Sequence, residues 1–357
     1  MSSAFLDACR LRPTSHTPVW IMRQAGRYQP EYRALREKVG FMELCRSPAL
    51  CSEVAVRAVE QLGVDAAIVF SDILVVLEPL GVGFEFTKDD GPRIERPIRT
   101  GADVHRVAAE IDAAGALAYV MDAIRTTRKD LAGRVPLIGF SGAPFTLASY
   151  MIEGGGSREY LHTKTLMFSD RGAWDALLSK ITDAVIRYLL AQIDAGAECL
   201  QLFDSWVGAL GPRDYVTYVQ PHMKRIFDAL GDRVPIIHFG TGNPALLPHM
   251  RRAGGHVIGI DHRADLREAW DLLERDGPIA VQGNLDPVLL LASREIMLER
   301  AEALIDQVGG KRGHIFNLGH GVLPGAKPED VRALVERVHE SSQRTSPARP
   351  SRLPPQA

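Results

Sequence analysis

Short, almost continuously apolar runs recur along the chain, and most are followed by a stretch with helical periodicity. A run of this kind, which does not alternate between apolar and polar residues, is typical of a strand that is buried on both faces in a parallel sheet. Seven such strands are predicted, at residues 66–70, 135–140, 197–203, 234–239, 256–260, 278–283 and 314–318.

The segments between these strands carry amphipathic helix patterns, for example at residues 115–133, 173–196, 215–231 and 293–310. Alternating strands and helices predict a distorted (β/α)₈ barrel, a TIM barrel, that forms a single α/β domain over residues 1–340. An eighth strand or, alternatively, a hairpin is expected within residues 80–98. A doubly wound open sheet is the competing fold, and it is disfavoured because no GxGxxG turn follows any predicted strand.

Composition narrows the class of protein but not its function. The chain has 357 residues, a hydrophobic fraction of 46% and a net charge of −2, so nothing global points to a nucleic-acid or membrane partner. No apolar run reaches membrane-spanning length, no signal-peptide core is visible, and the four cysteines form no CxxC or zinc-site spacing. We expect a cytoplasmic protein with free thiols and no metal. The Pro-, Ser- and Arg-rich end, 341–357, is expected to be a disordered tail.

Positive charge is concentrated near the start of the chain. Residues 1–46 hold eight Lys and Arg against four Asp and Glu. Within residues 18–36, an apolar run that resembles a buried strand ends at Arg23, and Arg27, Arg33 and Arg36 follow. Guanidinium groups bind carboxylates or phosphates in bidentate fashion, and small residues beside them leave the backbone open to a ligand. The alternative is a solvated turn with surface ion pairs.

Barrel enzymes place their sites at the carboxyl ends of the strands, where this chain carries several polar residues. Asp72 is followed by four apolar residues, and a carboxylate in such a place is costly unless it is paired or used. His320 lies between two glycines, which favours a functional role. For Tyr150, core and site are equally favoured. Structural roles as caps or loop hydrogen-bonding groups are favoured for Ser141, Asp204 and Asp261.

Seven motifs, in order, resemble the uroporphyrinogen decarboxylase family of tetrapyrrole biosynthesis. They are MRQAGRYQPEYR (22–33), FSDIL (70–74), GFSGAPFTLASYMIEG (139–154), QLFDSWVG (201–208), HFGTG (238–242), QGNLDP (282–287) and NLGHGVLP (317–324). The resemblance covers residues 4–340. It implies a distorted (β/α)₈ barrel, a homodimer whose two clefts face each other, and no metal or organic cofactor.

The resemblance also implies a set of substrate-binding positions. They are Arg23, Gln24, Ala25, Gly26, Arg27, Arg36, Asp72, Tyr150, Ser205 and His320, with a cleft lined by Ile68, Ile73, Phe140 and Phe203. Tyr32 stands where some members carry phenylalanine, and Ser205 stands where some carry threonine. Neither difference argues against activity.

The implied reaction removes the four acetate carboxyl groups of uroporphyrinogen III as CO₂ and gives coproporphyrinogen III. The substrate can serve as its own electron sink, since a protonated pyrrole ring accepts the electrons that each departing CO₂ leaves behind. Asp72 is the expected electrostatic partner of that cation, and Arg23, Tyr150 and His320 complete the expected catalytic set. The proton donor stays open among an arginine-bound water, Arg23 and His320.

Two other functions are compatible with this fold. Cobalamin-linked methyltransferases of the same superfamily bind zinc through His-x-Cys and a later cysteine, but this chain has His238-Phe239-Gly240 there and no cysteine after Cys199. A non-catalytic tetrapyrrole-binding protein is the second alternative, although Asp72, Arg23 and Arg27 are all present.

Overall fold

Seven parallel strands form one curled sheet in the computed structural model, which describes residues 3–87 and 91–344. Each strand overlaps one of the seven predicted runs, and the strands neighbour one another in chain order. They are β1 (Ala67–Ile68), β4 (Leu137–Gly142), β5 (Cys199–Asp204), β6 (Ile236–Gly240), β7 (Val257–Gly259), β8 (Ala280–Gln282) and β9 (His314–Ile315).

Residues 18–20 join the two edges of this sheet and complete the ring. On one side, the Trp20 N–H donates to the Phe316 carbonyl (3.3 Å) and the Phe316 N–H donates to the Pro18 carbonyl (2.8 Å). On the other side, the Asp65 N–H donates to the Val19 carbonyl (2.7 Å), just before β1. The apolar run that precedes the arginines therefore takes the eighth position of a distorted (β/α)₈ barrel.

The region at 80–98 does not contribute to the ring. It forms the predicted hairpin instead, with β2 (Phe84–Thr87) antiparallel to β3 (Gly91–Ile94) in a separate two-stranded sheet. The expectation of a barrel strand here is wrong because the segment before Arg23 already fills that place.

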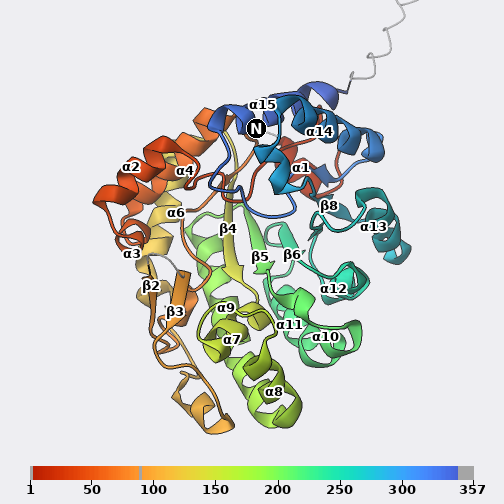
Figure 1. Ribbon diagram of the computed structural model, residues 1–357. Helices are drawn as coiled ribbons and strands as arrows, with labels where there is room; N and C mark the ends of the chain where they lie inside the picture. Colours follow the sequence, from red (N-terminus) through yellow and green to blue (C-terminus); the bar gives the residue numbers. More distant parts are fainter. Residues whose placement is uncertain (1–2, 88–90, 345–357) are drawn as a thin grey trace, which may run out of the picture.

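Helices surround the strands on the outside, as Figure 1 shows. The longer ones are α2 (Pro30–Lys38), α4 (Pro48–Leu62), α6 (Ala118–Leu131), α7 (Pro144–Glu153), α8 (Leu161–Ser169), α9 (Arg171–Ala195), α11 (Gln220–Leu230), α13 (Leu266–Leu273), α14 (Arg294–Val308) and α15 (Pro328–Ser341). Shorter helices are α1 (Ala4–Cys9), α3 (Phe41–Cys45), α5 (Ala113–Ala116), α10 (Pro212–Tyr218) and α12 (Leu247–Ala253).

The single helix predicted over 215–231 is wrong, since α10 ends at Tyr218 and α11 begins at Gln220. Pro221 explains the break. A proline has no N–H to donate and its ring clashes with the carbonyl of the preceding turn, so it is tolerated only in the first turn of a helix.

Helix α1 packs beneath the barrel, against β8 and β9. Its buried residues Phe5, Ala8 and Cys9 join the apolar side chains of the barrel interior in one cluster. Above them, Trp20 donates its indole N–H to Gln282 (2.7 Å), and the Gln282 amide donates to Gln201 (3.1 Å) across the interior. The amino-terminal end of the barrel is thus closed, and the carboxyl ends of the strands remain as the accessible mouth.

The end of α15 is tied to the start of the chain. Ser342 accepts the Thr17 N–H (2.8 Å), and the Arg344 N–H donates to the Ser15 carbonyl (2.8 Å). Ordered structure therefore extends a few residues past the predicted boundary at residue 340. The rest of the predicted tail, 345–357, lies outside the described residues.

All four cysteines are buried free thiols. Among the described residues, no helix combines the length and the apolarity needed to cross a bilayer.

We predict that Phe5→Ala lowers the free energy of unfolding by about 3–5 kcal/mol, because it empties a fully buried site in the helix that closes the barrel. Urea unfolding followed by circular dichroism measures the change. Val288→Ala is the control, since Val288 is 59% exposed, and it should change stability by less than about 0.5 kcal/mol. Equal effects of the two variants would show that α1 does not stabilise the barrel.

Candidate active site

The loop that follows the closing segment carries the arginines, and its conformation is fixed by buried side-chain amides. The Gln24 side chain accepts the Ile21 N–H (3.1 Å) and donates to the Ala66 carbonyl (3.1 Å). Further on, Gln29 accepts the Gly26 N–H (3.0 Å). Gln24 is buried, and its backbone is also occupied, since its N–H donates to the Ile21 carbonyl (2.8 Å) and its carbonyl accepts the Tyr28 hydroxyl (2.6 Å). Gln24 therefore holds the loop in shape, and the half-buried Ala25 is left beside the arginines.

Arg23 is the first residue of this loop to face the barrel mouth. Its backbone has φ 63°, in the left-handed region that L-residues seldom adopt. Its side chain lies across Gly321, where an added Cβ would come within 2.5 Å of the Arg23 Cδ. The absence of a side chain at Gly321 therefore gives the guanidinium its path to the mouth.

Arg27 and Arg36 flank this loop. Arg27 is exposed, while Arg36 donates to the Val39 carbonyl and lies over the Phe41 ring, with its Cζ 5.4 Å from the ring centroid. Among the described residues, none of Arg23, Arg27, Arg33 and Arg36 has a carboxylate oxygen within 4 Å. Within residues 3–87 and 91–344, the alternative of surface ion pairs is therefore not observed for these four side chains, and a guanidinium without a carboxylate partner is able to bind an external anion.

Asp72 follows β1 at the same end of the barrel. Its Oδ1 accepts the Leu74 N–H (2.9 Å). Burial raises the pKa of Asp72 to about 6, even though the Leu74 hydrogen bond and the positive charge of Arg23 act in the opposite direction. Asp72 is thus a poorly solvated carboxylate close to a guanidinium, with capacity left to accept further hydrogen bonds.

Tyr150 lies on α7, and its ring stacks on that of Trp206 with the centroids 3.8 Å apart. Burial, and then the negative charge of Asp72, raise the pKa of Tyr150 to about 12, with Arg23 acting against them. Tyr150 is therefore a neutral hydrogen-bonding group near both charges. Ser205, directly after β5, precedes Trp206 and is half-buried.

His320 comes from the loop after β9 and is exposed on the mouth side. Partial removal from water, and then the positive charges of Arg23, His262 and Arg263, lower the pKa of His320 below its ordinary value. The imidazole is consequently neutral at neutral pH. Gly319 permits the close approach of this loop to His262, since an added Cβ at Gly319 would lie 2.2 Å from the backbone nitrogen of His262.

The predicted apolar lining lies around the upper part of the barrel interior. Phe140 and Phe203 meet edge to face with their ring centroids 5.5 Å apart, and Ile68 and Phe203 pack partly exposed against the interior cluster. Ile73 stands beside Gly142, whose added Cβ would lie 3.3 Å from the Ile73 Cβ. These side chains form an apolar floor close to Asp72, which explains why that carboxylate is poorly solvated.

The structural roles favoured for three strand-end residues are confirmed. Asp261 accepts the Gly242 N–H (2.7 Å) and the Arg263 guanidinium (2.6 Å), and Ser141 donates to the Gly142 carbonyl (3.1 Å). Asp204 accepts a hydrogen bond from the Thr146 hydroxyl (2.9 Å). Burial raises the pKa of Asp204 to about 7 in spite of that hydrogen bond.

Sequence reasoning missed several residues that position the site. Trp206 supports Tyr150, Thr146 links Asp204 to the Trp206 N–H (3.2 Å), and Gly321 makes room for Arg23. Trp206 could have been identified from the sequence, because it directly follows Ser205 at the end of a predicted strand. The other two depend on which side chains meet in space, and no spacing along the chain indicates that.

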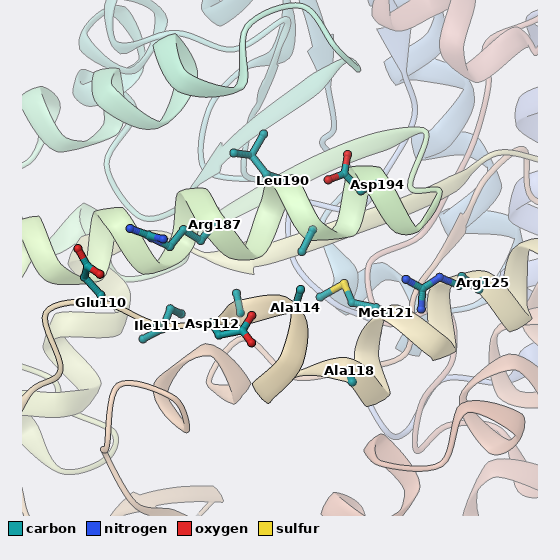
Figure 2. A pocket seen from close by; sticks show the side chains of 12 residues that line it. Glu110, Ile111, Asp112, Ala114, Ala118, Met121, Arg125, Arg187, Leu190 and Asp194 are labelled. Carbon is teal, nitrogen blue, oxygen red and sulfur yellow. The ribbon is translucent and has the colours of Figure 1, made fainter.

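A separate cavity of about 670 Å³ lies on the outer wall of the barrel, between α6 and α9 (Figure 2). Arg125 and Met121 from α6 face Arg187 and Asp194 from α9 across it. The cavity shares no residue with the site at the strand ends.

Comparison with known proteins gives the family. The family model described as uroporphyrinogen decarboxylase matches residues 2–341. A uroporphyrinogen decarboxylase from Carboxydothermus hydrogenoformans is 51% identical over 96% of this chain and 97% of its own length. One from Sorangium cellulosum is 50% identical over 99% of this chain and 100% of its own. This chain belongs to the uroporphyrinogen decarboxylase family.

Solved structures that resemble the chain agree on the fold. A methyltransferase from Methanosarcina mazei matches with a TM-score of 0.81 at 18% identity, over 95% of this chain and 99% of its own. A B12-independent methionine synthase from Listeria monocytogenes, described as putative, matches with a TM-score of 0.58 at 13% identity, over 92% and 98%. Identities this low support the barrel fold alone.

His238, the residue considered above for the zinc-binding alternative, points out of the barrel toward α11. It lies on β6, is fully buried and packs against Phe227 of α11 with ring centroids 5.1 Å apart. Its neighbours Ile237 and Phe239 point into the barrel instead. Burial lowers the pKa of His238 to about 4, as expected for an imidazole held neutral in the core.

We predict that Asp72→Asn raises the free energy of unfolding of the ligand-free protein by roughly 2–3 kcal/mol at pH 7.5. A carboxyl whose pKa is raised by folding, here to about 6, destabilises the folded state once the pH exceeds that value. The penalty shrinks as the pH falls from about 6 to about 4, because the carboxyl is then protonated in both states. Denaturation of both proteins at several pH values measures the difference.

The exposed Asp306 provides the control, because Asp306→Asn removes a charge without releasing a buried one. A stability difference between Asp72→Asn and the wild type that stays constant from pH 4 to 8 would contradict the burial of the Asp72 charge.

Proposed function

We propose that this chain is a uroporphyrinogen decarboxylase, which converts the four acetate side chains of uroporphyrinogen III to methyl groups without a cofactor. The products are coproporphyrinogen III and CO₂, in porphyrin biosynthesis. The observation that carries the proposal is full-length family membership together with a half-buried, poorly solvated carboxylate, Asp72, near the guanidinium of Arg23, which has no carboxylate partner among the described residues.

The arginines are assigned to the carboxylates of the substrate. Uroporphyrinogen carries acetate and propionate groups around a flexible ring, so it needs several fixed cations at different places. Arg23, Arg27 and Arg36 have no carboxylate partner in the part of the chain that the structure describes, and they come from one loop and the helix that follows it. The backbone N–H of Ala25 adds a donor at a place where the side chains are small.

Asp72 is assigned to the reacting pyrrole. Protonation of a pyrrole carbon makes the ring cationic, and the C–C bond to the carboxyl then breaks, with its electron pair passing into the ring and CO₂ leaving. A proton added to the exocyclic carbon then makes the methyl group, and loss of the proton first added to the ring carbon restores the pyrrole. A carboxylate that accepts pyrrole N–H groups stabilises this cation most effectively where water is excluded. The apolar floor around Phe140 and Phe203 supports that exclusion.

Tyr150, Ser205 and His320 are assigned to orienting the acetate and propionate arms. A neutral imidazole with a lowered pKa is better suited to donate a hydrogen bond to a carboxylate than to act as the general acid that protonates the pyrrole. Tyr150 stays protonated at any working pH and is held in place by Trp206. The proton for the pyrrole is accordingly assigned to a water molecule held by Arg23.

A homodimer in the cytoplasm, with the two mouths facing each other, is also proposed. The support is a group of large apolar side chains exposed beside the mouth, namely Leu161 and Phe168 on α8 and Val216 on α10. Sedimentation equilibrium measures the mass, and a monomer at micromolar concentration would contradict the dimer.

Turnover tests the proposal directly. The purified, chelator-treated protein is incubated with uroporphyrinogen III without oxygen, and the oxidised products are separated by chromatography. We expect hepta- through tetracarboxylate porphyrins to appear. Asp72→Asn should lower kcat/KM by about 10²–10³-fold, the usual loss for one preorganised electrostatic group. Asp306→Asn is the matched control and should keep the wild-type rate.

The alternatives give different results in the same experiment. Folded protein that binds the macrocycle but removes no carboxyl group would indicate the tetrapyrrole-binding function instead. Near-normal kcat/KM in Asp72→Asn would remove that residue from the chemistry while leaving the activity itself established.

A second variant tests the placement of Arg23. Gly321→Ala puts a Cβ where the Arg23 side chain runs, so the guanidinium has to move. We expect KM to rise about tenfold with a smaller change in kcat, because a carboxylate contact is made in both ground and transition states. Gly211→Ala, at a glycine with open space around it, is the control. Unchanged KM in Gly321→Ala would place Arg23 outside substrate binding.

A further inference from the structure

Two histidines and an aspartate meet at the end of the barrel opposite the mouth. The Asp65 carboxylate lies just before β1, His16 just before the closing segment 18–20, and His339 near the end of α15. The His16 Nε2 is 3.1 Å from the Asp65 Oδ1, and the His339 Nε2 is 2.7 Å from the Asp65 Oδ2. The two imidazole rings meet edge to face, with centroids 4.6 Å apart.

These donors are shielded but can be reached from solvent. The side chains of His16, Asp65 and His339 are 25%, 18% and 27% exposed. Burial raises the pKa of Asp65, but hydrogen bonds from His16, His339 and the Val19 N–H outweigh it and lower the pKa to about 2. The carboxylate is therefore ionised at any working pH.

We propose that this cluster binds one divalent transition-metal ion of the zinc type, through the His16 Nε2, the His339 Nε2 and an Asp65 carboxylate oxygen. Two imidazoles and one carboxylate are a donor set that zinc and its neighbours prefer over calcium or magnesium. One ligand atom from each residue lies within 4.8 Å of the other two. Ligand atoms around a tetrahedral zinc ion lie about 3.3 Å apart, so only small side-chain shifts are needed.

The imidazole protons of His16 and His339 can be placed so that both residues bind the metal. An ionised carboxylate only accepts hydrogen bonds, so both Nε2 atoms carry a proton in the metal-free protein. Metal binding moves each of these protons to the Nδ1 of the same ring through solvent, and the Nε2 lone pair then forms the metal bond. The His16 Nδ1 is 3.0 Å from the Ser15 hydroxyl, which can accept this proton's hydrogen bond and orient the ring.

The three ligands come from segments that are distant in the sequence but adjacent in the fold. A bound ion would cross-link the start of the chain, β1 and α15 at the place where the ring closes. The site shares no residue with the mouth, and it is thus a structural site that the decarboxylation does not use. It also explains why no ligand spacing is visible in the sequence, since the three residues are 49 and 274 positions apart.

The test uses full-length, tag-free protein that has been stripped with a chelator and then titrated with ZnCl₂ against a chromophoric chelator. We expect one equivalent of Zn²⁺ per chain and a Tm that rises with Zn²⁺. His339→Gln should weaken binding by more than about 100-fold, the upper range for loss of a residue that only supports a ligand, and should abolish the rise in Tm. Ser15→Ala should weaken binding about tenfold.

His256→Gln is the matched control. His256 pairs with one carboxylate, Asp232, at 3.1 Å, and no second histidine joins them, so its loss should leave Zn²⁺ binding unchanged. Cobalt substitution adds an independent readout, because its electronic spectrum separates imidazole and carboxylate ligation from binding to the buried thiols. A thiolate charge-transfer band on the wild type would overturn the proposal even if the His339 variant failed to fold.

Absence of saturable binding, or binding that survives His339→Gln unchanged, would likewise overturn the site. The decarboxylase rate of His339→Gln should equal that of the wild type, since His339 lies outside the proposed catalytic machinery. Failure of the metal site and failure of the proposed function are therefore distinguishable.

Discussion

Backbone pairing of residues 18–20 with both edges of the sheet is the constraint on which the rest of the molecule depends. It closes seven strands into a ring, and the same segment leads directly into the arginine loop. Arg23 therefore reaches the mouth at a position fixed by the hydrogen bonds around Pro18 and Val19. Gln24 holds the loop from within by bonding to Ala66 beside β1. The same segment therefore closes the barrel and positions the guanidinium of Arg23.

The electrostatics of the mouth depends on the poor solvation of the Asp72 carboxylate. The apolar floor removes water, Leu74 supplies one hydrogen bond, and Arg23 supplies charge without forming an ion pair. The carboxylate can accept further hydrogen bonds, and its negative charge is poorly stabilised because water is largely excluded. A ligand that brings several N–H donors and becomes cationic during the reaction meets both needs. If Asp72 has the role proposed above, the free protein loses stability at the position where the transition state is stabilised most.

Much of the fold was predictable, because burial on two faces leaves near-continuous apolar runs. All seven ring strands overlap predicted ones, and the apolar run before Arg23 was identified as strand-like. The eighth ring position was not assigned to that run because it pairs with segments far away in the chain. The break at Pro221 was missed because amphipathic periodicity continues through it.

For the site, residue chemistry and strand-end position indicated Asp72 and His320, and motif resemblance added Tyr150 and Ser205. Their supports were less accessible. The stacking of Trp206 on Tyr150 and the path of Arg23 over Gly321 arise only when separate loops meet. The His16, Asp65 and His339 cluster was not predicted for the same reason, since a ligand set spread over the whole chain has no recognisable spacing.

The contacts of residues 14–20 with the end of the chain affect how the protein folds during synthesis. Its partners lie near the other end of the chain, as with Thr17 and Ser342, which are 325 positions apart. During synthesis, β1 and its neighbours emerge long before Phe316 and α15 exist. The nascent barrel must therefore persist as an open sheet with unpaired edges, which are prone to association until the last strand arrives. A product that terminates before Phe316 would lack the strand that pairs with residues 18–20 and would remain in that open form.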